Sequence, residues 1–156
     1  MPFNRYLNKV IRTEHLQADS VGNEQTDANQ PKHIVFLYDF SVSGGAVSAI
    51  TLNDASAAAQ TIPGNAIVTN VIYEELTALA SSGSATVALG ILGNTDAFIA
   101  GTAFDNAAFT ADVSTKNNEV PLKNGGAPVP VVATIGTAAL TAGKFKLYVE
   151  YIEGTA

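Results

Sequence analysis

The segment KFKLYVEYI at residues 144–152 decides the fold class, because apolar and polar side chains alternate along it. Apolar and aromatic side chains occupy every second position, at Phe145, Leu147, Val149 and Tyr151. The positions between them include Lys144, Lys146 and Glu150. Successive side chains of a β-strand point to opposite sides of the sheet. The segment therefore predicts a strand with one face in a core and the other toward solvent.

The rest of the chain contains further short segments of this kind, separated by turn signals rich in Gly, Pro, Asn and Ser. We predict additional strands at residues 34–42, 66–76, 86–92 and 129–135. Pro128 and Pro130 favour an edge position for the last of these, since proline cannot donate to a sheet ladder. Residues 95–104 are expected to form one or two helical turns. Because helices do not alternate with the strands, the sequence predicts an all-β fold, an antiparallel β-sandwich or jelly roll.

The segment YDFSVSGGAV at residues 38–47 contains a Gly44-Gly45 pair that admits two interpretations. A phosphate-binding loop bends over glycines and then enters a helix whose free N–H groups face the anion. Residues 46–52 alternate loosely instead, and the sequence contains neither G-x-G-x-x-G nor G-x-x-x-x-G-K-[ST]. The glycine pair therefore predicts a two-residue hairpin turn between two strands.

The charge content is unusually low. Charged residues make up 14% of the 156 residues, whereas an ordinary soluble domain has roughly 25%. A surface this poor in charge suggests that much of it is covered by other protein. The net charge of −6 and the scattered Lys and Arg residues argue against a nucleic-acid partner. The sequence has no cysteine, so its stability must come from packing or oligomerisation rather than from disulfides.

Three long uncharged windows, residues 55–73, 76–95 and 124–143, are long enough to cross a bilayer. Each is interrupted by Gly, Pro, Asn, Gln or Ser, so we expect strands and turns there and no membrane partner. Residues 1–15 mix charged and apolar side chains and do not resemble a signal peptide.

Residues 1–33 differ from the rest of the chain in charge, and we predict that they form an N-terminal arm in front of a body at residues 34–156. The arm carries four basic and four acidic residues, whereas the body carries four basic and ten acidic ones. Five apolar side chains recur at the spacing of one helical face: Phe3, Tyr6, Leu7, Val10 and Ile11. Residues 17–30 are polar and have almost nothing to bury.

The arm is thus expected to be an extended segment that carries a short amphipathic helix followed by a polar strap. We predict that its apolar face docks in an apolar groove of a neighbouring protein subunit. Arg5 and Arg12 would pair with acidic groups at the rim of that groove. An arm folded back over an edge of its own sheet is the alternative.

The body offers no convincing catalytic or metal site. Glu74 and Glu75 are adjacent, and neighbours on a strand point to opposite faces, so they are expected to be exposed carboxylates that share no site. His15 and Asp19 stand four residues apart but lack a third ligand. A Ca²⁺ ion bound in a loop is an open alternative, because oxygen ligands are offered by Asn94, Asp96, Asp105 and Asp112. The sequence contains no EF-hand loop, however. Both histidines lie in the arm, so the body has no histidine that would act as a general base for a serine. We therefore expect no enzyme and no cofactor.

The order of four segments resembles a known group of proteins. These segments are YDFSVSGGAVSAITL, IPGNAIVTNVIYEELTA, SGSATVALGI and LTAGKFKLYVEYI. Together they resemble small virion structural proteins of tailed bacteriophages over residues 36–152, and most closely the capsid decoration, or cement, proteins. The resemblance implies a β-sandwich, commonly a homotrimer, that sits on the capsid exterior and clamps neighbouring major capsid subunits. It also implies synthesis in the host cytoplasm and no catalytic residue, and it does not extend to the arm.

A charge-poor, cysteine-free β domain also fits a receptor- or carbohydrate-binding domain of a phage head or tail fibre. A sugar-binding domain usually exposes aromatic side chains as stacking platforms. This chain has no Trp, and its Tyr and Phe residues fall mostly on alternating strand positions or in the arm. The decoration protein is therefore the favoured interpretation.

Overall fold

The computed structural model describes residues 30–116 and 118–154. The chain divides into two units, Met1–Gln30 and Pro31–Ala156, and the second unit is called the body from here on. The helix and strap predicted for the arm lie outside the described residues. The first strand begins at Lys32, two residues before the predicted start of the body.

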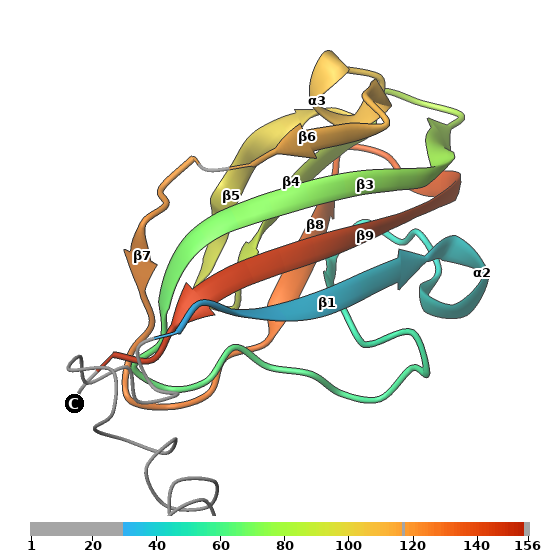
Figure 1. The fold of residues 1–156 in the computed structure, drawn as a ribbon. Helices are drawn as coiled ribbons and strands as arrows, with labels where there is room; N and C mark the ends of the chain where they lie inside the picture. Colours follow the sequence, from blue (N-terminus) through green and yellow to red (C-terminus); the bar gives the residue numbers. More distant parts are fainter. Residues whose placement is uncertain (1–29, 117, 155–156) are drawn as a thin grey trace, which may run out of the picture. The chain divides into compact units, whose positions relative to one another are not determined.

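The body consists of two antiparallel β-sheets that pack on each other (Figure 1). Sheet A has the strand order β1 (Lys32–Asp39), β9 (Leu140–Ile152), β3 (Ile67–Ser81) and β6 (Val113–Thr115), with β7 (Leu122–Lys123) also paired to β3. Sheet B has the order β2 (Ala49–Thr51), β8 (Val131–Gly136), β4 (Thr86–Ile91) and β5 (Asn94–Ala103). Two short helices, α2 (Phe40–Ser43) and α3 (Ala107–Thr110), connect strands. The prediction of an all-β sandwich is confirmed.

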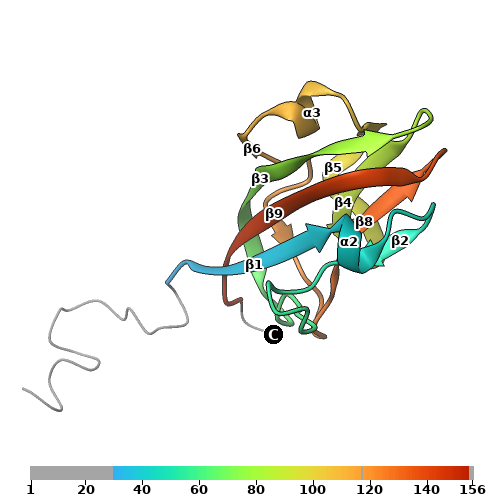
Figure 2. The same ribbon diagram turned by 90° about the vertical axis from the view of Figure 1, so that its right-hand side faces the viewer.

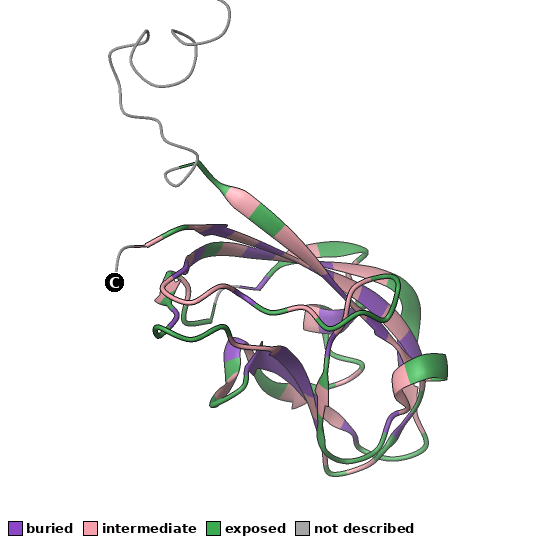
Figure 3. Ribbon diagram, turned by 90° about the horizontal axis from the view of Figure 1, so that it is seen from below, coloured by how far each residue is buried: buried purple, intermediate pink, exposed green. Residues whose placement is uncertain are grey.

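The alternation predicted for the last strand is also confirmed. β9 runs between β1 and β3 in sheet A (Figure 2). Its apolar side chains are all buried in the core, at Phe145, Leu147, Val149 and Tyr151. The ring of Phe145 stacks on Tyr38 at 5.0 Å between centroids and contacts Tyr73 at 5.1 Å. Figure 3 shows that the strands carry most of the buried residues, whereas most connecting loops are exposed.

The two-residue hairpin predicted at Gly44-Gly45 is wrong. β1 ends at Asp39, whose carboxylate accepts a hydrogen bond from the Ser41 N–H at 2.9 Å and begins the helical turn α2. Gly44 ends this turn with a φ of 70°, and a Cβ on Gly45 would collide with the Leu140 carbonyl. The chain then enters β2, which pairs with β8 in the other sheet. The glycines therefore terminate a helical turn and let the chain cross between sheets.

Two further predictions are corrected. Residues 95–104 are not helical, because they lie almost entirely in β5, whose pairing with β4 has two register shifts. These irregularities bury the consecutive residues Ala97 and Phe98 and hide the alternation that marks a regular strand. β8 is not an edge strand, since it pairs with both β2 and β4. Its prolines do not interrupt the ladder because Pro130 precedes its first residue, Val131.

Candidate functional site

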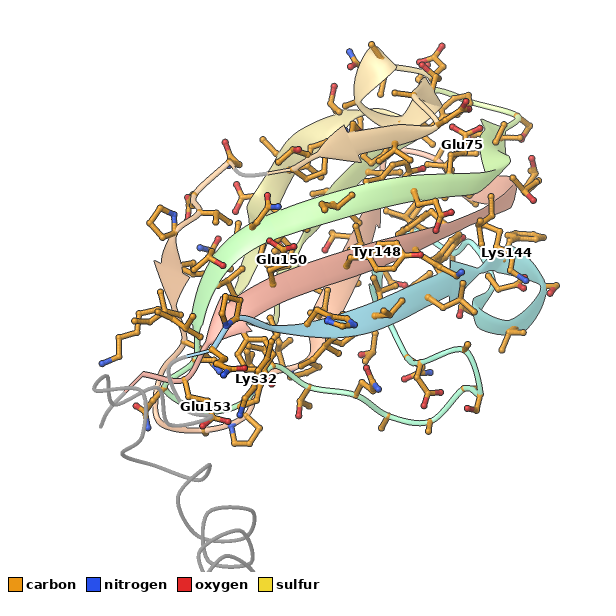
Figure 4. The ribbon with its side chains drawn as sticks, in the orientation of Figure 1. Lys32, Glu75, Lys144, Tyr148, Glu150 and Glu153 are labelled. Carbon is orange, nitrogen blue, oxygen red and sulfur yellow. The ribbon has the colours of Figure 1, made fainter. Side chains whose placement is uncertain are left out.

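The outward face of sheet A carries most of the charge of the two sheets. Lys144 Nζ contacts the Asp39 carboxylate at 2.7 Å, and Tyr148 donates its hydroxyl hydrogen to Glu74 at 2.6 Å. Lys146 lies 3.9 Å from Glu74. Figure 4 shows that Lys144, Tyr148 and Glu150 lie along β9, with Lys32 and Glu153 together at one end of the sheet. The charged side chains of this face therefore contact one another or Tyr148.

Two pKa shifts follow from these contacts. Hydrogen bonds from Lys144 and Ser41 lower the pKa of Asp39 to about 2. The hydrogen bond to the Glu74 carboxylate raises the pKa of the Tyr148 hydroxyl. Both groups are partly accessible to solvent, which screens each contact, so its contribution to stability is modest.

The outward face of sheet B has the opposite character. The four strands of this sheet contain one charged residue, Asp96, whereas the strands of sheet A contain eight. One cross-strand row on its outward side consists of Ala49, Thr134 and Ala88. Uncharged side chains line this side of the sheet, where the low charge content of the chain is concentrated, and Ala88 and Val132 are themselves buried.

A groove runs beside β1, the outer strand of sheet A. It consists of two adjoining cavities of about 370 and 120 Å³ that share Leu37, Asp54 and Ala55. β1 forms one wall and the loop at residues 53–60 forms the other, joined where the Leu37 N–H donates to the Asn53 carbonyl at 2.7 Å. The complete lining is His33, Ile34, Val35, Leu37, Asp39, Val42, Ser43, Asn53, Asp54, Ala55, Ser56, Ala57, Gln60, Lys144 and Lys146. We call this feature the β1 groove.

The loop wall of the β1 groove is held in place by Asp54. Its carboxylate accepts hydrogen bonds from the Ser56 N–H at 2.7 Å and the Ala58 N–H at 2.8 Å. Val42 at one end of the groove is 69% exposed, which is high for an apolar side chain. Gln60 in the loop wall has a buried Oε1 that accepts no hydrogen bond from the described residues. The groove thus combines a preformed shape with apolar surface and one unused acceptor.

The two adjacent glutamates point to opposite sides of β3, as predicted, but their exposure was predicted wrongly. Glu74 faces outward toward Lys146 and Tyr148. Glu75 faces inward, where its Oε2 is buried without a described hydrogen-bond donor. Burial of Tyr73, and secondly the charge of Glu75, raise the pKa of the Tyr73 hydroxyl. Both side chains are half-buried because they lie within the long strand β3 and not at its end.

Lys116 is buried next to this inward-facing part of β3. Its side chain is 6% exposed, and its ammonium lies 5.4 Å from the centre of the Tyr73 ring. Burial lowers the pKa of Lys116, because a charged amine is poorly solvated there. No acid lies within ion-pair distance of this amine in the described part of the chain. The arrangement provides no second group with which the amine would carry out a reaction.

The candidate Ca²⁺ ligands do not form one site. Asn94 and Asp96 lie at the start of β5, whereas Asp105 follows its end, so a strand of about 30 Å separates them. Across residues 30–116 and 118–154, no three acidic or histidine side chains are placed to hold a metal ion. Helices long and apolar enough to span a membrane are likewise absent from those residues. The predicted docking residues of the arm and the His15–Asp19 pair lie outside the described residues.

No protein-family model matches the chain, and no curated protein sequence matches it. Solved structures with the same fold do exist. A chain in the cyanophage Pam1 capsid asymmetric unit aligns with a TM-score of 0.62 and 17% identity, over 90% of this chain and 96% of that chain. A chain in the acidic stable capsid structure of Helicobacter pylori bacteriophage KHP30 aligns with a TM-score of 0.57 and 14% identity, over 81% and 91% of the two chains.

A chain in the capsid of Ralstonia phage GP4 aligns with a TM-score of 0.58 and 16% identity, over 83% of this chain and 88% of that chain. At these identities the similarity shows a shared fold. The high coverage on both sides also means that the matched chains are close in length to this one.

Proposed function

We propose that this protein is a structural protein of a phage virion, and specifically a decoration protein that binds the outside of the head. In this role it clamps neighbouring major capsid subunits as a homotrimer. The observation that carries the proposal is the fold shared with chains of three phage capsids, each matched over nearly its whole length.

The surface of the body supports a binding role. The outward side of sheet B is nearly uncharged, whereas charged side chains on the outward side of sheet A contact one another or Tyr148. Uncharged surface of this kind is typically covered by other subunits, either copies of the chain or the capsid. The fibre-domain alternative is disfavoured because no aromatic side chain is exposed among residues 30–116 and 118–154. All of the exposed large apolar residues there are aliphatic: Val42, Val47, Leu76, Leu92 and Val113.

Residues 1–33 are proposed as the docking arm, with the face of Phe3, Tyr6, Leu7, Val10 and Ile11 as its contact surface. A polar strap such as residues 17–30 buries too little to offset about 1 to 2 kcal/mol of ordering per residue, so we expect it to become ordered only against a partner. A variant that lacks residues 1–30 is expected to remain folded and to lose binding to purified heads in co-sedimentation. Undiminished binding by this variant would refute the docking arm.

Two measurements test the larger proposal. Electron microscopy of the particle should show the protein on the outer surface of the head, and light scattering should give the mass of a trimer at tens of micromolar. Density for the protein on the tail alone would contradict the decoration role, and a clean monomer would contradict the homotrimer.

A further inference from the structure

We infer that the β1 groove binds the N-terminal arm of a second copy of this chain, with the predicted helix at residues 3–11 as the docked element. The inference deepens the proposed function, since it names the partner of the arm, and it rests on that function for the homotrimer. Three properties of the groove support this assignment: its apolar surface, the Asp54 carboxylate, which forms no ion pair with a described residue, and the presence of one groove for each arm.

The apolar face of the predicted helix is short enough to lie within the groove. Val35, Leu37, Val42 and Ala55 contribute apolar surface along the groove. The distance along β1 from His33 to Asp39 is about 20 Å at the rise of a strand. A helical stripe from Phe3 to Ile11 is about 12 Å long. The stripe therefore fits within the groove, in the way that amphipathic helices bind to grooves on other proteins.

The charges at the rim complement the arm. Lys144 is paired with Asp39, and Lys146 faces Glu74 on sheet A, so both cations of the rim have an acidic partner. Asp54 is the contrasting case, because its carboxylate accepts only backbone hydrogen bonds and forms no ion pair with a described residue. Residues 1–16 contain three basic residues and one acidic residue. A guanidinium from Arg5 or Arg12 would supply the missing charge at Asp54.

The arm is long enough to reach another copy. Residues 13–30 number 18 and span up to about 60 Å when extended, whereas a body of this size has a radius of gyration of about 14 Å. Gln30 precedes Pro31 and is therefore biased toward extended conformations, which disfavours a tight reversal of the chain in front of β1. A neighbouring groove can be reached without such a reversal.

The number of partners also favours a second copy over a capsid subunit. Each chain carries one arm and one β1 groove, so passing each arm to the next copy uses every arm and every groove once. Such head-to-tail contacts close into a ring when the rotation between copies permits it. A trimeric ring of this kind would present several copies to the capsid at once, so a variant without the arm would lose head binding because it loses the trimer.

Disulfide trapping tests the inference cleanly because the natural chain has no cysteine. The test variant is the full chain with Leu7→Cys in the arm and Ala55→Cys at the exposed groove wall. The matched control pairs Leu7→Cys with Ala100→Cys, an exposed position on β5 in the other sheet. After mild oxidation, non-reducing electrophoresis and mass spectrometry should show cross-linked dimers and trimers of the test variant. Their yield should exceed the control by on the order of tenfold or more, because docking raises the effective concentration of the two thiols.

The outcomes are separable from those of the proposed function, which is tested by head binding of the same preparation. A cross-link within one chain, found as a monomer with an internal disulfide, would overturn the inference in favour of an arm folded on its own body. Equal cross-linking yields for the test and control variants would also overturn the inference, because the arm would then contact both surfaces without specificity. Normal head binding without any cross-link would also overturn it, and the decoration role would stand with the arm bound to the capsid. Cross-linked trimers without head binding would support the exchange of arms and refute the decoration role.

Discussion

Replacement of Leu147 by Ala tests the register of β9 in the centre of the sandwich. Leu147 is completely buried and is paired with Phe36 on β1 and Tyr73 on β3, which are themselves 0% exposed. Large-to-small substitutions of buried leucines destabilise proteins by about 2 to 5 kcal/mol, depending on how far the surroundings close over the space. Bulky aromatic neighbours close over such a space poorly. We therefore expect a loss of about 3 to 5 kcal/mol in the free energy of unfolding.

The loss is measured by urea unfolding at a fixed protomer concentration, because association would otherwise change the apparent stability. Tyrosine fluorescence and circular dichroism are suitable probes, since the chain has five Tyr and no Trp. Leu92→Ala is the matched control, because Leu92 is 59% exposed after β4 and its truncation should change the free energy by less than about 0.5 kcal/mol. An equally small loss for Leu147→Ala would show that β9 does not present this side chain to the core.

Three further substitutions probe single interactions. Asp39→Asn should lower the thermal midpoint at pH 7, and the difference should disappear as the pH falls from 3.8 to about 2, because a lowered carboxyl pKa contributes stability only above that window. A difference that persists at about pH 2 would contradict the role of the charge. Gly143→Ala should cost about 1 to 3 kcal/mol in urea unfolding, because Gly143 has a φ of 139° and a Cβ there would collide with Leu79. Gly101→Ala is its control, since a Cβ at Gly101 meets nothing closer than 4.0 Å, and equal losses at both sites would refute the argument. Lys116→Met should leave the thermal midpoint at pH 7 unchanged or raised, because burial disfavours the charged amine, and the natural chain should gain on the variant as the pH rises toward 10.5. A clear destabilisation at pH 7 would instead mean that the ammonium contact with the neighbouring aromatic ring dominates.

The strands that were predicted well are those in which burial follows the period of two without interruption. β9 is an example, since its inward residues from Phe145 to Tyr151 are all apolar and its alternation is visible in the sequence. β5 was missed because register shifts place Ala97 and Phe98 in the core one after the other. A bulge of this kind depends on pairing with another strand, which local sequence does not specify.

The change of sheet after β1 was missed for a different reason. Residues 40 and 42 continue the apolar alternation of β1, so the pattern favours a longer strand. The Asp39 carboxylate nevertheless caps a helical turn through Ser41, and Val42 ends up exposed. An aspartate whose carboxylate accepts from the N–H two residues later offers the backbone an alternative to the strand, and Asp39 was visible in the sequence. The β1 groove was not predictable, because it forms between β1 and a loop whose position depends on the folded sheets.

The central place of β9 in sheet A has a consequence for the order in which the protein folds. Within the described part of the chain β1 pairs with one strand, β9, and the pairing of Lys32 with Tyr151 joins residues more than a hundred positions apart. Contacts this distant in sequence slow folding, because a long loop must close before they form. During synthesis β1 emerges early but waits for residues 140–152 before it can pair, and until then its edge is open to other chains. Until β9 is complete, sheet A lacks its second strand, and we expect the partly folded body to be most prone to aggregation at this stage.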